Sequence, residues 1–296
     1  NSQEIFLGWE PQWILIKRSS TTEGWMIYDS MRGIVDSNGN DDKRFEANFN
    51  DAEASVNHIQ LTSRGFTFTT NNNTVNYLGD TYIFCAIRRP DGYVGKPAEA
   101  GTDVFTMDTG NSSATIPCFD SGFPVDFAWR KSTTAGWGTD DSKWRAIARL
   151  TQGKTLMTHV TDNEDTDSNI PIFDSNVGIS KGDDSNFQAW MWKRHAGMDV
   201  VTYKGNGSGG RLINHSLNKA PEMMWIKNRT TDGYDWAVYH KGLNGGSSPE
   251  DYWVKLNSSS AEADDNGLWN DTAPTSTVFK IGTASAVNRN NDNFIA

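Results

Sequence analysis

One pattern of residues occurs three times along this chain of 296 residues, and it constrains the fold more than any other feature. A segment that runs from Pro to Lys is followed by a segment that begins with Trp. The copies are Pro11–Lys17 with Trp25–Tyr28, Pro124–Lys131 with Trp144–Ala148, and Pro221–Lys227 with Trp236–Tyr239. They recur roughly a hundred residues apart, which is the size of a domain and not of a short solenoid repeat.

Segments between these motifs are also similar from copy to copy. An acidic turn recurs at Asn50–Ser55, Thr161–Asp165 and Ser260–Asp264, a closing strand at Tyr82–Arg89, Phe187–Arg194 and Phe294–Ala296, and an opening strand at Asp103–Met107 and Asp199–Tyr203. The sequence therefore predicts three tandem modules, residues 1–98, 99–197 and 198–296. The first module lacks an opening strand and the third ends within its closing strand, as expected for part of a longer array.

The apolar residues alternate with a period of two, which is typical of β-strands. Gly65–Thr69 and Thr277–Ile281 alternate apolar and polar residues, as in strands with one face on a core. Ile14–Ile16 and Tyr82–Ile87 are apolar on both faces, which predicts central strands. Clusters of Asn, Asp, Gly and Ser separate the strands, and no long amphipathic segment is present. We expect an all-β protein made of tandem antiparallel β-sandwich modules.

Two segments are ambiguous between strand and helix. Trp144–Thr151 has apolar residues at helical spacing, but its alignment with Trp25–Tyr28 and Trp236–Tyr239 favours a strand. Asp51–Val56 has the residues to cap and form one helical turn in a loop.

Charge and apolar run length exclude two classes of partner. The chain has 37 acidic and 27 basic residues, a net charge of −10, and no basic cluster that would attract nucleic acid or an anionic membrane. Its purely apolar runs are far shorter than the roughly 20 residues that a membrane-spanning helix needs, and no signal peptide is visible. The two cysteines, Cys85 and Cys118, are expected to be buried or part-buried thiols, with a single disulfide as the alternative.

No motif in the sequence predicts a catalytic, metal or cofactor site. Gly205–Gly210 matches a dinucleotide-binding glycine pattern, but no amphipathic helix follows it, so a turn is expected. Asp36–Asp42 alternates oxygen ligands as a calcium loop does, yet lacks the closing acidic residue, which favours a solvated loop over a weak calcium site. A hydrolase pair of carboxylates would be invisible among so many acidic residues.

Tryptophan is the most unusual component of the composition, with twelve residues. Those on the repeated strands are expected to fill cores: Trp13, Trp25, Trp144, Trp225 and Trp236. Trp137 and Trp269 lie in polar surroundings and are expected to be exposed. Exposed Trp rings stack on sugar faces and anchor protein contacts, so these two are the candidate residues for binding a glycan or a partner.

Several of these segments resemble a repeat domain of unknown function that is common in tailed bacteriophages of aquatic bacteria. The segments are Gly8–Arg18, Ile87–Pro90, Ser121–Ala128, Ala220–Thr230, Trp236–Leu243 and Trp269–Phe279. The resemblance covers essentially the whole chain and is weakest at Lys131–Trp144, where the second copy carries an insertion. It implies concanavalin-like or jelly-roll sandwiches in virion surface proteins such as tail fibres, and it brings no catalytic residues.

We therefore expect a non-enzymatic structural protein of a virion surface, part of a tail fibre or similar appendage with a role in host attachment. Its expected partners are other virion proteins, copies of itself and a host-surface glycan, with no cofactor, nucleic acid or membrane insertion. A carbohydrate-binding adhesin or a capsid decoration protein is the alternative, and a polysaccharide-degrading enzyme is the third hypothesis.

Overall fold

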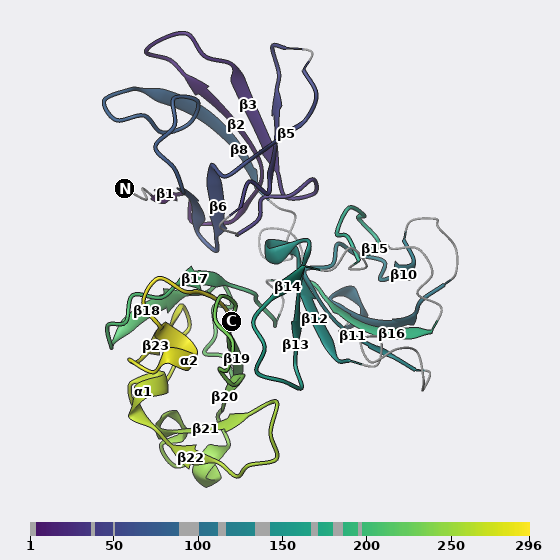
Figure 1. Ribbon diagram of the computed structural model, residues 1–296, viewed down its shortest axis with the longest axis vertical. Coiled ribbons are helices and arrows are strands. Elements are labelled where there is room, and N and C mark those ends of the chain that lie inside the picture. Colours follow the sequence, from purple (N-terminus) through teal and green to yellow (C-terminus); the bar gives the residue numbers. More distant parts are fainter. Residues whose placement is uncertain are drawn as a thin grey trace.

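Antiparallel β-sheets build the protein, which is seen here in a computed structural model (Figure 1). The structure describes residues 4–36, 39–49, 51–88, 101–111, 117–133, 143–166, 171–179, 186–194 and 197–296. Its sheets form three lobes that follow one another along the chain: an N-terminal lobe (residues 4–88), a middle lobe (101–194) and a C-terminal lobe (197–296). The prediction of an all-β sandwich fold is confirmed.

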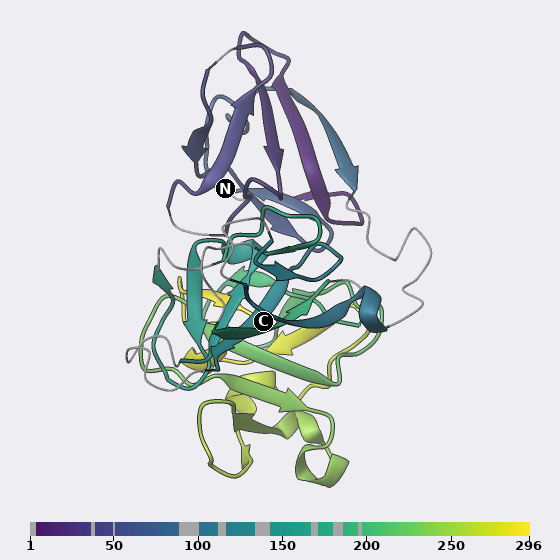
Figure 2. The ribbon, with the colours of Figure 1, turned by 90° about the vertical axis from the view of Figure 1, so that its right-hand side faces the viewer.

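The N-terminal lobe packs a five-stranded sheet on a three-stranded one (Figure 2). The large sheet has the order β5-β4-β3-β2-β8, with β2 Pro11–Arg18, β3 Trp25–Asp29, β4 Asp42–Glu46, β5 Ala54–Val56 and β8 Tyr82–Arg88. The small sheet has the order β1-β7-β6, with β1 Glu4–Phe6, β6 Ile59–Thr62 and β7 Gly65–Phe68.

The middle lobe has a six-stranded sheet of order β14-β13-β12-β11-β16-β9 and the pair β10-β15. The bounds are β9 Phe105–Thr109, β10 Phe119–Asp120, β11 Phe127–Ser132, β12 Arg145–Ala148, β13 Lys154–Met157, β14 Asp165–Thr166, β15 Gly178–Ile179 and β16 Phe187–Trp192. Two 3-10 turns accompany them, η1 Gly101–Asp103 and η2 Arg149–Thr151.

The C-terminal lobe has a six-stranded sheet of order β17-β24-β19-β20-β21-β22 and the pair β18-β23. The bounds are β17 Thr202–Lys204, β18 Arg211–Asn214, β19 Met223–Asn228, β20 Ala237–His240, β21 Tyr252–Lys255, β22 Ala263–Asp264, β23 Val278–Ile281 and β24 Asn293–Ile295. Its short helices are η3 Leu243–Gly246, η4 Pro249–Asp251, α1 Asn266–Trp269 and α2 Ser285–Asn288.

The large sheets of the three lobes have the same strand order. From closing strand to last strand they read β8-β2-β3-β4-β5, β16-β11-β12-β13-β14 and β24-β19-β20-β21-β22. The middle and C-terminal lobes add one strand, β9 or β17, beside the closing strand. In the described part of the chain, no strand pairs with the outer edge of β8. The prediction that Tyr82–Ile87 is a central strand is therefore wrong, and Ile83 is 52% exposed.

Each of the two ambiguous segments contains a strand, and the first continues into the 3-10 turn η2. Arg145–Ala148 pairs with β11 on one side and β13 on the other, so the choice of strand for this segment is confirmed. The helical turn expected within Asp51–Val56 is wrong, because Ala54–Val56 pairs with Asp42–Arg44 as the edge of the sheet. Pairing with β4 satisfies backbone groups that a single helical turn would leave open.

Each lobe has a core between its large and small sheets. In the N-terminal lobe, Ile14, Ile16, Met26 and Tyr28 are buried together with residues of the small sheet: Ile59, Leu61, Phe66 and Phe68. The middle and C-terminal lobes have clusters of their own, around Phe119 and Met191 and around Ile226 and Trp269.

The faces of the large sheets that point away from these cores are also apolar. In the middle and C-terminal lobes these outer faces pack on each other. The rings of Trp129 on β11 and Trp225 on β19 lie edge to face with centroids 5.5 Å apart. Nε1 of Trp236 donates a hydrogen bond of 2.9 Å to the carbonyl of Met157. The two lobes are thus joined by an apolar layer between their sheets.

Neither cysteine forms a disulfide. Cys118 is buried as expected, whereas Cys85 on β8 is exposed, so the expectation of a buried or part-buried thiol is wrong there and the disulfide alternative is excluded. No helix in the described residues is long and apolar enough to cross a bilayer.

Candidate functional site

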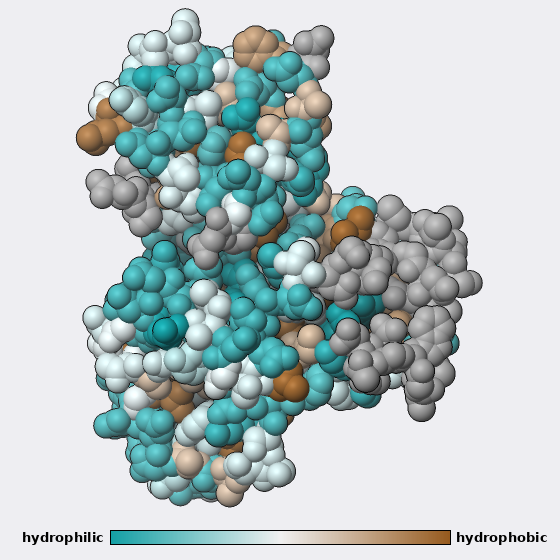
Figure 3. Space-filling model, viewed as in Figure 1, coloured by the Kyte–Doolittle hydropathy of each residue, from teal (hydrophilic) through white to brown (hydrophobic). Residues whose placement is uncertain are grey.

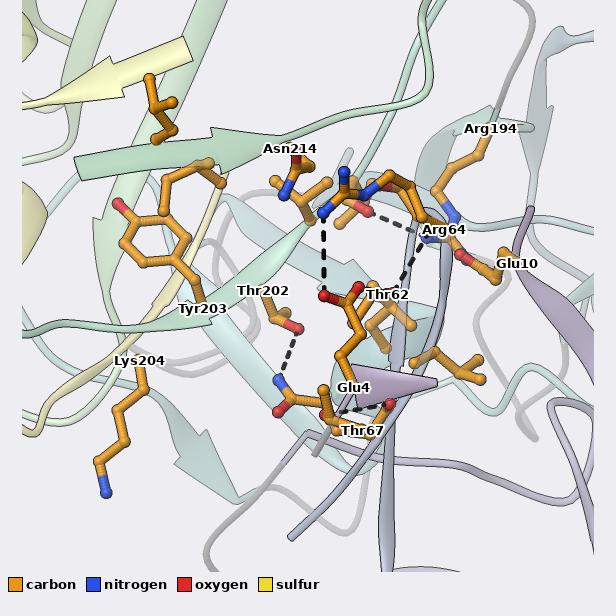
Figure 4. A pocket seen from close by; sticks show the side chains of 18 of the residues that line it. Glu4, Glu10, Thr62, Arg64, Thr67, Arg194, Thr202, Tyr203, Lys204 and Asn214 are labelled. Atoms are coloured by element: carbon orange, nitrogen blue, oxygen red, sulfur yellow. Dashed lines mark hydrogen bonds and ion pairs between the residues drawn. The ribbon is translucent and has the colours of Figure 1, made fainter. Parts of the chain in front are cut away.

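A polar pocket of about 270 Å³ lies where the N-terminal lobe meets the C-terminal lobe (Figure 4). The small sheet of the N-terminal lobe lines one side, and β17 and β18 line the other. The labelled side chains of Glu4 and Arg64 point toward each other, with Thr62 beside them. The pocket is built from elements more than a hundred residues apart, so only the packing of the lobes creates it.

Hydrogen bonds and ion pairs connect many polar groups of this pocket. Arg64 Nη2 lies 3.8 Å from Glu4 Oε2, and the hydroxyl of Thr62 donates to Glu4 Oε1 at 3.1 Å. Gln60 Nε2 donates to the hydroxyl of Thr202 at 3.3 Å, which links the two lobes directly. The Glu4 carboxylate is thus engaged by Arg64 and Thr62.

A buried ion pair forms part of the lining of the pocket. Arg194 donates through Nη2 to the Glu10 carboxylate and through Nη1 to the carbonyl of Val200 at 3.0 Å. Burial acts to lower the pKa of Arg194, but the carboxylates of Glu10, Asp126 and Asp199 raise it above its ordinary value. Arg194 is therefore a permanent cation at the junction of the three lobes.

The mouth of the pocket has a cationic side on the C-terminal lobe. Arg211 Nη1 donates to the carbonyl of Lys204, and burial lowers the pKa of Arg211. The hydroxyl of Tyr203 donates to the carbonyl of Val287 at 2.8 Å, and burial raises the pKa of this phenol. The Tyr203 hydroxyl is thus engaged by the protein and keeps its proton, and the Arg211 guanidinium is the group of the two that can donate to a small polar or anionic molecule.

A larger, apolar cleft of about 900 Å³ lies between the middle and C-terminal lobes. Its lining is mostly aliphatic and aromatic, and includes Phe127, Ala148, Leu156, Met198, Leu217, Pro221, Met223, Trp192 and Trp225. The volume falls within the range of small-molecule binding sites. The cleft is a gap left where the two outer faces do not meet.

Two titratable residues in this cleft are engaged by their own loop. The Asp199 carboxylate accepts hydrogen bonds from Val200 N and from both the backbone N–H and the hydroxyl of Ser216, at 2.8–2.9 Å. His215 Nε2 lies 3.2 Å from the carbonyl of Thr275, and Nδ1 accepts from Leu217 N. Burial lowers the pKa of His215, which favours the neutral ring. Both groups therefore have hydrogen-bond partners within the C-terminal lobe.

Three buried arginines cross-link the lobes, and Arg194 is the first. Arg149, after β12, donates to the carbonyl of Phe173 at 2.6 Å within its lobe and to the carbonyl of Ser30 in the N-terminal lobe at 3.5 Å. Arg229, after β19, is bound by Asp36 of the N-terminal lobe at 3.0 Å and by Glu164 of the middle lobe at 2.7 Å. These contacts hold the three lobes in one arrangement.

Of the two Trp residues expected to bind a ligand, the structure describes only Trp269. Trp137 lies outside the described residues. Trp269 is 1% exposed, and its Nε1 donates to the carbonyl of Tyr252 at 2.9 Å, so the expectation that it is exposed is wrong. The polar residues around it cap the short helix α1, where the Asp265 side chain accepts from Gly267 N. This cap turns the ring of Trp269 into the core.

The expected core role of the strand tryptophans is only partly correct. Trp236 is buried, but Trp13, Trp144 and Trp225 are half-buried and Trp25 is 36% exposed. These residues lie on the outer faces of the large sheets and not between the sheets of a sandwich. Burial of Trp225 and Trp236 comes from the contact between lobes.

The carboxylates of the proposed calcium loop are held by protein groups. Asp42 accepts hydrogen bonds from the backbone N–H groups of Val35, His58 and Ile59 at 2.8–3.1 Å. Asp36 binds Arg229. Within the described ranges, no group of three His, Cys, Asp or Glu side chains is close enough to hold a metal. These two aspartates therefore have structural partners.

The arginine cross-links are the functional residues that sequence reasoning missed. The only signal was position, because Arg149 and Arg229 directly follow the strands β12 and β19, and Arg194 lies two residues after β16. A basic residue at a strand end is ordinarily solvated, and its partners here are distant in sequence.

The fold and the sites define an all-β protein of interlocked antiparallel sheets. The chain belongs to the family described as a domain of unknown function, DUF7483, whose model matches residues 1–89 and 102–296. A search of curated proteins and of solved structures finds no match to the chain.

Proposed function

We propose that this protein is a structural component of a bacteriophage virion surface, part of a tail fibre or similar appendage that takes part in host attachment. The observation that carries the proposal is the set of three large sheets with one strand order, cross-linked by buried arginines. Such an array suits a protein that must hold surfaces in fixed positions, since each lobe is braced by its neighbours.

The same observation supports a tandem repeat with modules at residues 1–98, 99–197 and 198–296. The closing strands β8, β16 and β24 have equal places in the three sheets, and so do the strands β2, β11 and β19. Equal strand order across segments of similar length is the expected result of duplication of one unit.

Hydrophilic residues cover most of the face seen in Figure 3, with hydrophobic ones at scattered places. With the net charge of −10, this surface favours dispersion at high copy number. The proposed partners are other virion proteins, copies of the chain itself and a host-surface glycan, at an extracellular location.

Imaging of labelled antibody on intact phage particles tests the proposal. Label at a defined place on fibres or another appendage is the expected result, and particles without label would contradict it. A glycan array and an assay for release of reducing ends from host polysaccharide test the adhesin and enzyme alternatives. Two variants locate any activity found in these assays: Glu4→Gln alters the polar pocket, and Met223→Ala alters the apolar cleft.

A further inference from the structure

The large sheet of the N-terminal lobe has an apolar face that no core covers. Because side chains alternate along a strand, residues in register on β2, β3, β4 and β8 share this face. They are Trp13, Leu15, Trp25, Ile27, Phe45, Ile83, Cys85 and Ile87, here called the N-terminal outer face. Ile83 is 52%, Ile87 48%, Phe45 38% and Trp25 36% exposed. Contiguous exposed apolar residues of this kind mark interaction surfaces.

The equivalent faces of the other two lobes show what covers such a surface. Leu15 lies opposite Ile27 and Cys85, Trp129 lies opposite Ala146 and Trp190, and Trp225 lies opposite Val238. Leu15, Trp129 and Trp225 thus have the same place in their sheets. Trp129 and Trp225 pack on each other across the lobe contact, with ring centroids 5.5 Å apart. Leu15 has no such counterpart among the described residues, because the outer face around it meets no other sheet.

In the middle and C-terminal lobes, therefore, the outer face of one large sheet is covered by the outer face of the other. Among the residues that the structure describes, the third face is left without one, since the other two cover each other. A second copy of the chain offers a face of the same shape and composition, and two-fold symmetry lets one surface meet itself.

Charged side chains lie at the margins of the face. Lys17 lies opposite Trp25 at one end, and Asp29 lies opposite Trp13 at the other, where it pairs with Arg32 at 2.6 Å. The Arg32 guanidinium also lies over the ring of Phe45, 4.1 Å from its centroid. An apolar centre with a charged margin is the usual composition of a protein interface.

We propose that the N-terminal outer face is a self-association surface, on which a second copy of this chain packs sheet against sheet. The proposed function includes contact between copies of the chain, and this inference rests on it only by identifying the surface through which that contact occurs. The face carries one native reporter, the exposed thiol of Cys85, while Cys118 is buried in the middle lobe.

Sedimentation equilibrium of the full chain is the first test. We expect a dimer whose dissociation constant rises about tenfold or more in the double variant Ile83→Lys/Ile87→Lys, because two lysines then enter an apolar interface. The matched control is Leu212→Lys on β18, since Leu212 is 55% exposed and lies outside the face. A protein that stays monomeric at all concentrations, or a dimer indifferent to the double variant, overturns the proposal.

Thiol labelling of Cys85 is the second test, and it does not depend on the variant. We expect the labelling rate of Cys85 to fall as the protein concentration rises, while Cys118 stays unreactive throughout. In the double variant, Cys85 stays reactive at every concentration. Dimerisation that leaves Cys85 fully reactive places the contact elsewhere and overturns the proposal. A dimer that behaves as expected but is absent from phage particles refutes the proposed function alone.

Discussion

Arg194 and Glu10 lie 184 residues apart in the chain and form an ion pair with both side chains 1% exposed. The pair joins the closing strand of the middle lobe to the start of β2 in the N-terminal lobe. Arg194 also donates to Val200 of the C-terminal lobe. One side chain therefore contacts all three lobes.

Removal of this arginine is expected to destabilise the whole protein. Arg194→Met leaves the Glu10 carboxylate buried without its cation, at a cost of about 3–5 kcal/mol in the free energy of unfolding. Chemical denaturation followed by tryptophan fluorescence measures this. Lys241→Met breaks an exposed pair with Glu222 and is the control, with no change expected. A loss confined to one lobe would contradict the role of Arg194 as a three-lobe contact.

Two tryptophans at the same place in their lobes are expected to differ in their contribution to stability. Trp236 is 3% exposed and its ring lies in the contact with the middle lobe, whereas Trp25 is 36% exposed. Trp236→Ala should cost about 3–5 kcal/mol, and Trp25→Ala under about 1 kcal/mol in the monomer. Thermal unfolding of both variants at low concentration makes the comparison. Equal losses of unfolding free energy in the two variants would contradict this expectation.

A stability change with pH is expected from His58. Burial lowers the pKa of His58 to about 4, and its Nδ1 lies 2.7 Å from the hydroxyl of Tyr28. Since this folded-state pKa is below the ordinary value of 6.5, the stabilisation is complete above pH 6.5 and is lost as the pH falls through 4. Its size is about 3 kcal/mol.

Asp42 acts in the opposite direction over part of the same range. Burial raises its pKa to about 6, so its contribution is complete below pH 3.8 and is lost as the pH rises through 6. Unfolding free energies from pH 4 to 7 should be compared between the wild type and His58→Gln. The loss on acidification should be smaller in the variant, and parallel curves would contradict the assignment to His58.

Gly65 is expected to be required for the small sheet of the N-terminal lobe. A Cβ atom at this position would lie 1.9 Å from the carbonyl oxygen of Ile5 on β1, so the strands would have to separate. Gly65→Ala should cost about 2 kcal/mol or more, measured by urea denaturation. Gly101→Ala, where a Cβ meets nothing within 4 Å, is the control and should leave stability unchanged.

Little of the candidate site was open to prediction from sequence. The polar pocket needs Gln60 and Thr202 to meet across two lobes, and the arginine contacts join residues such as Arg229 and Asp36. Neither spacing nor residue type indicates these pairs. Trp269 was misplaced because its polar neighbours resemble a surface loop, although they form a helix cap.

The sequence by itself indicated the strands with a clear apolar pattern, such as β2 and β7, because alternation of apolar residues is a local property of a strand. It did not indicate the short edge strand Ala54–Val56, where a helical turn was expected. It also indicated the order of strands along each lobe, because similar motifs follow one another in the same order in the three lobes. Only the tertiary structure decided what covers each apolar face of a sheet. Strands β2, β11 and β19 are apolar on both faces, and for β11 and β19 the cover of the second face comes from another lobe. The pattern of Tyr82–Ile87 indicates a central strand for that reason, although within the described residues it is an edge strand whose outer face meets no other sheet.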